Sequence, residues 1–130
     1  MKLTVYITNE STEPTVVNED LIFNSNSTNV LSVICQDEEL QRVDITGATV
    51  KFAVKEKASD TDASAKILKT ITDLTSPTAG EFDVEIEPAD CDDLVGSYIW
   101  QMEITLADSG KFILSEGTVT FTRNIIGITE

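Results

Sequence analysis

The sequence predicts an all-β protein, a sandwich of about seven antiparallel strands with Greek-key connections. Three observations predict this fold. Threonine, valine and isoleucine, whose β-branched side chains suit strands, are abundant. Apolar and polar residues alternate through several segments. Turn-forming clusters, such as DITG at 44–47 and ADSG at 107–110, separate these segments, and no convincing helical pattern lies between them.

The strongest strand signal lies at 97–106, SYIWQMEITL, where one face is apolar and Ile99 is the exception on the other. The apolar face is made of Tyr98, Trp100, Met102, Ile104 and Leu106. The same alternation predicts strands at 3–7, 48–55 and 81–87. Segment 30–36 is apolar on both faces, as in a central strand, and the lysines of 65–71 indicate an edge strand.

Three segments depart from simple alternation. In 111–123 the apolar phase slips across Ser115–Gly117, which predicts one continuous strand with a β-bulge near Gly117. Residues 88–94, PADCDDL, are expected to form a single helical turn. Residues 8–20 are polar and contain Pro14, which predicts a long surface loop or arm.

The stretch DDLVGSYIW indicates which kind of sandwich this is. In immunoglobulin-like folds a tyrosine near the start of a central strand folds back over the preceding turn and bonds upstream backbone. Leu94, Gly96 and Tyr98 have the spacing that such a corner requires. Trp100 stands where an antibody domain has its second disulfide cysteine, so we expect its ring to fill the core. Gly96, Tyr98 and Trp100 are therefore assigned to the structural corner and core.

Composition narrows the classes of function. Nine basic against 23 acidic residues give a net charge of −14, so nucleic acid and anionic membranes are not expected as partners. No run approaches the roughly 20 apolar residues of a membrane helix, and the first residues lack a signal-peptide pattern, so synthesis in a cytoplasm is expected. Cys35 and Cys91 are expected to be separate buried thiols, and the absence of histidine excludes most zinc sites and histidine-based catalysis.

Calcium is the metal that the acidic turns could hold. The loops at 58–64 and 87–96 are expected at one end of the sandwich, and calcium takes six to eight oxygen ligands. Their carboxylates are Asp60, Asp62, Asp90, Asp92 and Asp93. The EF-hand pattern is incomplete, so solvated turn aspartates are the favoured interpretation, and no cofactor is expected.

Enzymatic and sugar-binding roles have weaker support. Glu85, Glu87 and Glu103 lie on predicted outward faces without an aromatic cleft, so we do not expect a glycosidase, or an enzyme of any kind. Most aromatic side chains fall on inward phases. Tyr6 falls on an outward phase, and one exposed tyrosine is a poor platform for binding a sugar.

The C-terminal segment 124–130 carries Ile125, Ile126 and Ile128 beyond the last predicted strand. Two interpretations stay open. The isoleucines extend the last strand and pack on their own sandwich, or they form an apolar tail that contacts a neighbouring subunit by strand addition or in a groove.

Residues 20–123 resemble the immunoglobulin-like domain at the N-terminus of bacteriophage baseplate upper proteins and of related tail and neck proteins. The matching stretches are DLIFNSNSTNVLSVICQ, DITGATVKFAVKEK, TAGEFDVEIEPAD and LVGSYIWQMEITLADSGKFILSEGTVTFT, with Ile45 in place of the usual leucine. In that family the domain is joined to modules that carry fibre or receptor binding. The resemblance implies the sandwich fold and a structural role in a virion.

The sequence therefore predicts one domain over 1–130 that serves as a non-enzymatic structural protein of a phage or prophage virion. It is expected to be made in the host bacterial cytoplasm, to dock onto other virion proteins of the tail baseplate or neck, and to occur as a homo-oligomer in the particle. One alternative is a carbohydrate-binding or adhesive module, with a calcium-dependent version in which the acidic loops hold the ion. The other is a standalone bacterial immunoglobulin-like protein of unrelated use.

Overall fold

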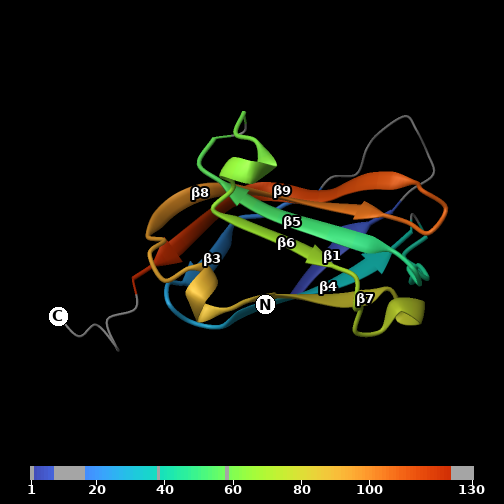
Figure 1. Ribbon diagram of the computed structural model, residues 1–130. Coiled ribbons are helices and arrows are strands. Elements are labelled where there is room, and N and C mark those ends of the chain that lie inside the picture. The colour runs from blue at the N-terminus through green and yellow to red at the C-terminus, as the bar shows by residue number, and fades with distance from the viewer. Residues whose placement is uncertain (1, 8–16, 38, 58, 124–130) are drawn as a thin grey trace.

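The computed structural model describes residues 2–7, 17–37, 39–57 and 59–123. Within these ranges the strands form two sheets that pack face to face (Figure 1), which confirms the predicted all-β sandwich. The elements are β1 (Lys2–Tyr6), β2 (Val17–Asn18), β3 (Leu21–Asn24), β4 (Asn29–Gln36), β5 (Thr49–Lys55), η1 (Asp62–Ser64), β6 (Ile67–Ile71), η2 (Pro77–Ala79), β7 (Glu81–Ile86), η3 (Pro88–Asp90), β8 (Gly96–Thr105) and β9 (Lys111–Thr122).

The smaller sheet has the order β1-β4-β7, and the larger sheet has the order β9-β8-β5-β6 with β2 and β3 both paired to the outer side of β9. Both sheets are mixed, because β1 runs parallel to β4, and β2 and β3 run parallel to β9. The expected arrangement of about seven antiparallel strands therefore needs two corrections: there are nine described strands, and three pairs are parallel. Alternation reports which face a residue occupies, and it carries no information about strand direction.

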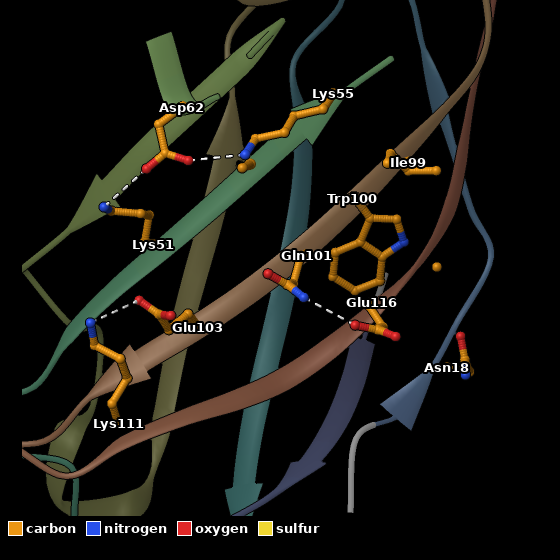
Figure 2. A pocket seen from close by; sticks show the side chains of 12 residues that line it. Asn18, Lys51, Lys55, Asp62, Ile99, Trp100, Gln101, Glu103, Lys111 and Glu116 are labelled. Atoms are coloured by element: carbon orange, nitrogen blue, oxygen red, sulfur yellow. Dashed lines mark hydrogen bonds and ion pairs between the residues drawn. The ribbon is translucent and has the colours of Figure 1, made fainter. Parts of the chain in front are cut away.

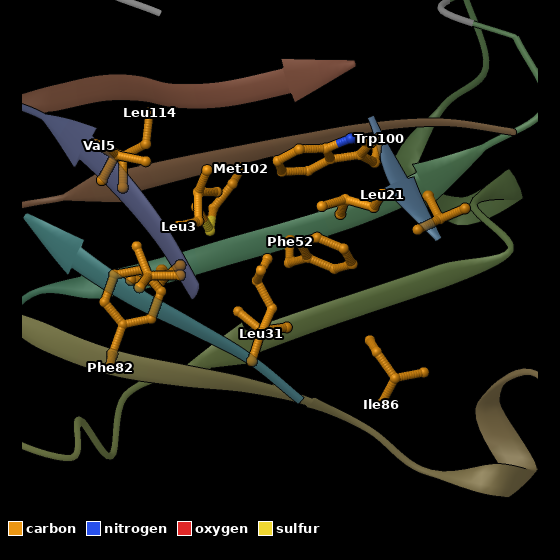
Figure 3. Packing of buried hydrophobic residues seen from close by; sticks show 14 of the residues in the cluster. Leu3, Val5, Leu21, Leu31, Phe52, Phe82, Ile86, Trp100, Met102 and Leu114 are labelled. Carbon is orange, nitrogen blue, oxygen red and sulfur yellow. The ribbon is translucent and has the colours of Figure 1, made fainter. Parts of the chain in front are cut away.

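The core lies between the two sheets and contains most of the rings (Figure 3). Phe52 of β5 and Trp100 of β8 pack with ring centroids 5.6 Å apart, and Phe82 enters from the smaller sheet. Burial of each such side chain contributes about 1.5–3 kcal/mol to folding. The inward phases predicted for the central strands are therefore the phases that form the core.

Strand β9 is continuous from Lys111 to Thr122, as predicted, but its bulge lies elsewhere. Met102 of β8 pairs with Ser115 and Glu103 pairs with Ile113, so Leu114 is the extra residue. Leu114 and Ser115 are both fully buried, which two consecutive residues of a regular strand would not be. The predicted bulge is present in this strand, but it lies at Leu114, three residues before Gly117.

Gly117 makes room for a neighbouring segment. A Cβ atom at this position would collide with the backbone oxygen of Glu19, which lies between β2 and β3. The Trp100 indole Nε1 donates to that same oxygen at 3.0 Å, and the Ser115 hydroxyl donates to the oxygen of Val17 at 2.6 Å. Residues 17–20 are thus an anchored sheet edge, so the prediction of a loop over 8–20 was wrong there; 8–16 lie outside the described residues.

The corner before β8 ends at Gly96, the first residue of that strand, whose φ of +103° lies in a region that L side chains rarely adopt. Leu94 is buried in the core. The Tyr98 hydroxyl donates to the backbone oxygen of Val95 at 3.4 Å, and the rings of Tyr98 and Phe121 form a T-shaped pair with centroids 6.0 Å apart. Tyr98 therefore covers the turn that precedes its own strand.

The edge strand β6 carries an inward-facing charge. Lys69 shares the inward phase of Ile67 and Ile71, and its ammonium lies 2.6 Å from the carboxylate of Asp90, which ends η3. A charge that points inward from an edge strand opposes pairing with another sheet. The predicted edge position of this strand is confirmed, and the predicted helical turn is the short 3-10 helix η3.

Candidate functional site

A groove of about 520 Å³ is hollowed into the outer face of the larger sheet (Figure 2). Its floor and walls come from β5, β8 and β9, with Asn18 of β2 at one side and Asp62 of η1 at another. Because strand residues alternate between faces, the outward positions of these three neighbouring strands converge on one surface. The groove is therefore a product of the same alternation that fills the core behind it.

Differences in side-chain length create the hollow. On β5 the small Ala53 stands between two long side chains, Lys51 and Lys55. On β9 Gly117 has no side chain at all. Trp100 borders the groove from beneath, since it is only 2% exposed and its ring packs on Phe52. The tryptophan therefore belongs to the core and offers no open aromatic surface.

Charged side chains cross the sheet in a row at one end of the groove. Lys51 of β5 lies opposite Glu103 of β8, and the Lys111 ammonium of β9 approaches the same Glu103 carboxylate at 3.9 Å. The next row pairs Ala53 with Gln101, whose amide donates to Glu116 at 3.0 Å. Cations therefore flank a single carboxylate at this end of the groove.

Asp62 fixes the lysines of β5. Its carboxylate lies 3.0 Å from the Lys55 ammonium and 3.4 Å from that of Lys51. Hydrogen bonds from Lys55 and then Lys51 hold the pKa of the Asp62 carboxyl below its ordinary value. Lys55 also donates to the backbone oxygen of Asp60 at 3.0 Å. The lysine pair thus already holds a carboxylate that the protein supplies itself.

The groove differs in charge from the whole protein. Lys51, Lys55 and Lys111 are among the nine basic residues of the chain, and Asp62, Glu103 and Glu116 balance them. The lining is therefore locally neutral on a protein whose net charge is −14. Its ammonium groups, carboxylates and amides can form ion pairs and hydrogen bonds with a ligand.

The acidic loops do not form the calcium constellation that was considered. The loops around η1 and η3 do lie at the same end of the sandwich. Lys55 is the last residue of β5, before the η1 loop, and it pairs with Ile99, which lies near the start of β8, after the η3 loop. Asp62, however, binds the β5 lysines, and Asp90 binds Lys69. Across the described ranges, no three Asp, Glu or Cys side chains gather in a way that could hold a metal ion. Asp60, Asp92 and Asp93 join no such group.

The burial of the rings bears on the sugar hypothesis for the described residues. The buried rings are Phe23, Phe52, Phe82, Trp100 and Phe121. Tyr6, Tyr98 and Phe112 are half-buried and come from different parts of the two sheets. Within the described ranges, therefore, no exposed ring lines the groove as a stacking platform for a sugar.

Sequence reasoning did not single out the groove lysines. Lys51 and Lys55 fall on the outward phase of the strand predicted at 48–55, and the alternation alone gives them no role. The available signal was the pattern lysine, alanine, lysine at alternate positions of a central strand, which puts a hollow between two charges. The proposed tail contacts Ile125, Ile126 and Ile128 lie outside the described residues.

No protein-family model matches this sequence, and no curated protein matches it. Among solved structures, the fold is similar to the N-terminal domain of phage TP901-1 ORF48, with a TM-score of 0.51. The likeness covers 94% of this chain and 99% of that domain, at 10% sequence identity. The two chains share a fold. No helix of the described residues is long and apolar enough to cross a membrane.

Proposed function

We propose that this protein is a non-enzymatic structural module of a phage or prophage virion, which docks onto other virion proteins of the tail baseplate or neck. The observation that carries the proposal is the likeness to a phage domain over nearly the full length of both chains. The sequence resemblance to baseplate upper proteins supports the same class independently of the coordinates.

The molecule is built in a way that suits docking. The sheets enclose a core of fully buried apolar side chains, so the outer faces keep a fixed shape. The groove on the larger sheet presents ionic and amide groups for recognition. In this proposal the protein needs no cofactor, binds neither nucleic acid nor membrane, and occurs in several symmetric copies in the particle.

Analysis of purified particles tests this proposal. Particles released from the strain that carries the gene are banded on a density gradient, and their proteins are quantified by mass spectrometry. The proposal expects the chain to co-purify with the particles at a fixed ratio to the major tail protein. A chain found only in the cell lysate, while the particles contain their other tail proteins, would contradict it.

A further inference from the structure

Leu40 combines an exposed side chain with an unfavourable backbone conformation. It is 64% exposed, and its φ of +64° lies in the left-handed region. In the described part of the chain, the other non-glycine residues with a positive φ are Asn26 and Ser109, which are small and polar. A left-handed backbone brings Cβ close to the following carbonyl oxygen, so it is unfavourable for leucine. Both the backbone and the solvation of this residue therefore oppose leucine here.

The turn that carries Leu40 is closed by several hydrogen bonds. The Leu40 N–H donates to the backbone oxygen of Asp37 at 3.1 Å, and the Asp37 N–H donates to that of Gln41 at 2.9 Å. The Asp37 carboxylate accepts from the N–H groups of Glu39 at 2.9 Å and Gln41 at 3.0 Å. In short loops of this kind the left-handed position is usually occupied by glycine. The turn therefore has a fixed shape, which glycine or asparagine would suit better than leucine.

Exposure alone would carry no inference, since single apolar side chains are common on protein surfaces. The exposed Ile22, Val30 and Leu68 lie on β3, β4 and β6, where alternation turns every second residue outward. Leu40 lies in the turn after β4, outside any strand, and its side chain adds little to the core. Backbone strain at a position where packing does not require it points to a contact with another molecule.

We propose that Leu40 inserts into an apolar pocket of another virion protein, with lysine or arginine side chains at the rim of that pocket. This inference rests on the proposed function as a docking module, and it names the contact residue and the chemistry of the partner. Asp37, Glu38 and Glu39 directly precede Leu40 in the sequence, so the segment carries three negative charges. A cationic rim complements these charges. Because the turn is already closed, binding orders no loop, which favours affinity.

A different protein, rather than a second copy of this chain, is the partner. Within the described ranges, the groove on the larger sheet is lined mostly by charged and amide side chains, so it does not suit a leucine. The net charge of −14 also opposes the approach of an acidic segment to another copy. The partner is therefore expected to carry positive charge around an apolar pocket.

Two measurements on Leu40→Asn in the full chain test the proposal. Asparagine adopts the left-handed backbone more readily than leucine, so urea unfolding should show the folding equilibrium constant raised about threefold. Attachment to purified particles should weaken about tenfold or more, because burial of a leucine side chain contributes at least that much. Mass spectrometry of washed particles measures the attached chain. A variant that is less stable than the natural chain, or that attaches equally well, would overturn the proposal.

Control variants separate Leu40 from a general effect of surface changes. Leu40→Met keeps a flexible apolar side chain and should keep attachment. Leu68→Asn removes an exposed leucine from β6 by the same substitution and should also keep it. Equal losses with Leu40→Asn and Leu68→Asn would contradict a specific contact.

Photo-cross-linking in purified particles identifies the partner. A diazirine analogue of leucine placed at position 40 should cross-link to another virion protein, and the same analogue at position 68 should not. A cross-link from position 40 to a second copy of this chain only, or to no protein, would overturn the proposal.

The two proposals fail in different ways. A natural chain that is present in purified particles, together with a Leu40→Asn variant that is present at the same level, keeps the structural role and loses Leu40 as its contact. A natural chain that is absent from particles contradicts the virion role, and with it a virion partner for Leu40. Urea unfolding of each variant shows whether a loss of attachment comes from a loss of folding.

Discussion

The indole Nε1 of Trp100 donates a hydrogen bond to the backbone oxygen of Glu19 at 3.0 Å. Trp100 comes from β8 in the middle of the larger sheet, and Glu19 lies between β2 and β3 at its edge. The same tryptophan therefore fills the core with its ring and fixes the sheet edge with its N–H group. Gly117, its cross-strand neighbour, leaves the space that this contact needs.

Trp100→Phe should destabilise the protein through this bond. Phenylalanine keeps an aromatic ring in the core, but the Glu19 oxygen loses its donor. Leaving such a group unpaired costs about 1–3 kcal/mol, and the smaller ring adds to this. Urea unfolding measures the loss. An unchanged free energy of unfolding would show that the bond contributes nothing to the edge.

Gly117→Ala should displace the same segment from the other side. The new methyl group meets the Glu19 backbone, which must move away from β9. Such overpacking costs about 1–3 kcal/mol. Because both changes loosen Glu19, the double variant with Trp100→Phe should be less destabilised than the sum of the two single variants. Strict additivity would contradict a shared role at this edge.

Lys69→Val should make the protein associate. The substitution removes the inward charge from β6 and leaves Asp90 without its ammonium partner at 2.6 Å. An apolar edge strand is free to pair with the edge of another molecule. Sedimentation at increasing concentration measures the association. Thr70→Val, on the outward face of the same strand, adds the same side chain and should leave the protein in its original state.

Acid should weaken the fold partly through Asp90. Burial raises the pKa of its carboxyl, but hydrogen bonds from Lys69 and the Glu87 N–H outweigh this and lower it below the ordinary 3.8. A carboxyl with a lowered folded pKa stabilises the protein above its unfolded value, and that contribution is lost as the pH falls. The free energy of unfolding should therefore decrease from about pH 5 to pH 2.

Asp90→Asn tests the assignment of this acid sensitivity. The asparagine amide cannot take up a proton as the pH falls, so the part of the pH dependence that Asp90 causes should disappear. Urea unfolding at neutral and acidic pH measures the difference between the two proteins. A variant whose free energy of unfolding falls as steeply with acid as that of the natural chain would refute the role of Asp90.

Both thiols should be inert in the folded protein. Burial raises the pKa of the Cys35 thiol to about 12, and Cys91 is also fully buried. The thiolate is the reactive form, so an aromatic disulfide reagent should react with neither residue before unfolding. In urea both should react at once. Fast reaction of one thiol in the native state would contradict this prediction, and it would show that the structure around that cysteine opens locally.

The alternating strands were predictable, because a strand with one buried face alternates apolar and polar residues along the sequence. Segment 97–106 predicted β8 and the inward position of Trp100 correctly. The edge strand β2 was missed, because a two-residue strand in a polar segment has no periodicity of its own. Its pairing depends on Gly117 and on two side-chain donors from distant strands. Contacts of that kind are set by tertiary structure.

The groove was less predictable than the fold. Alternation assigns Lys51 and Lys55 to the outer face, but it does not say which strands lie beside β5. Only the pairing with β8, and of β8 with β9, brings Lys111 to the same surface. The acidic loops were expected at one end, and they are there. Their carboxylates nevertheless point to different lysines, which loop position alone does not reveal.

Chemical cross-linking of purified particles tests the docking account most directly. A carbodiimide joins a lysine amine to a carboxylate in contact with it, and the Lys55–Asp62 pair within the chain serves as an internal standard. The account predicts cross-links that join a lysine or a carboxylate of this chain to another virion protein. Particles that contain the chain and give the internal cross-link, but no cross-link from this chain to another virion protein, would contradict it.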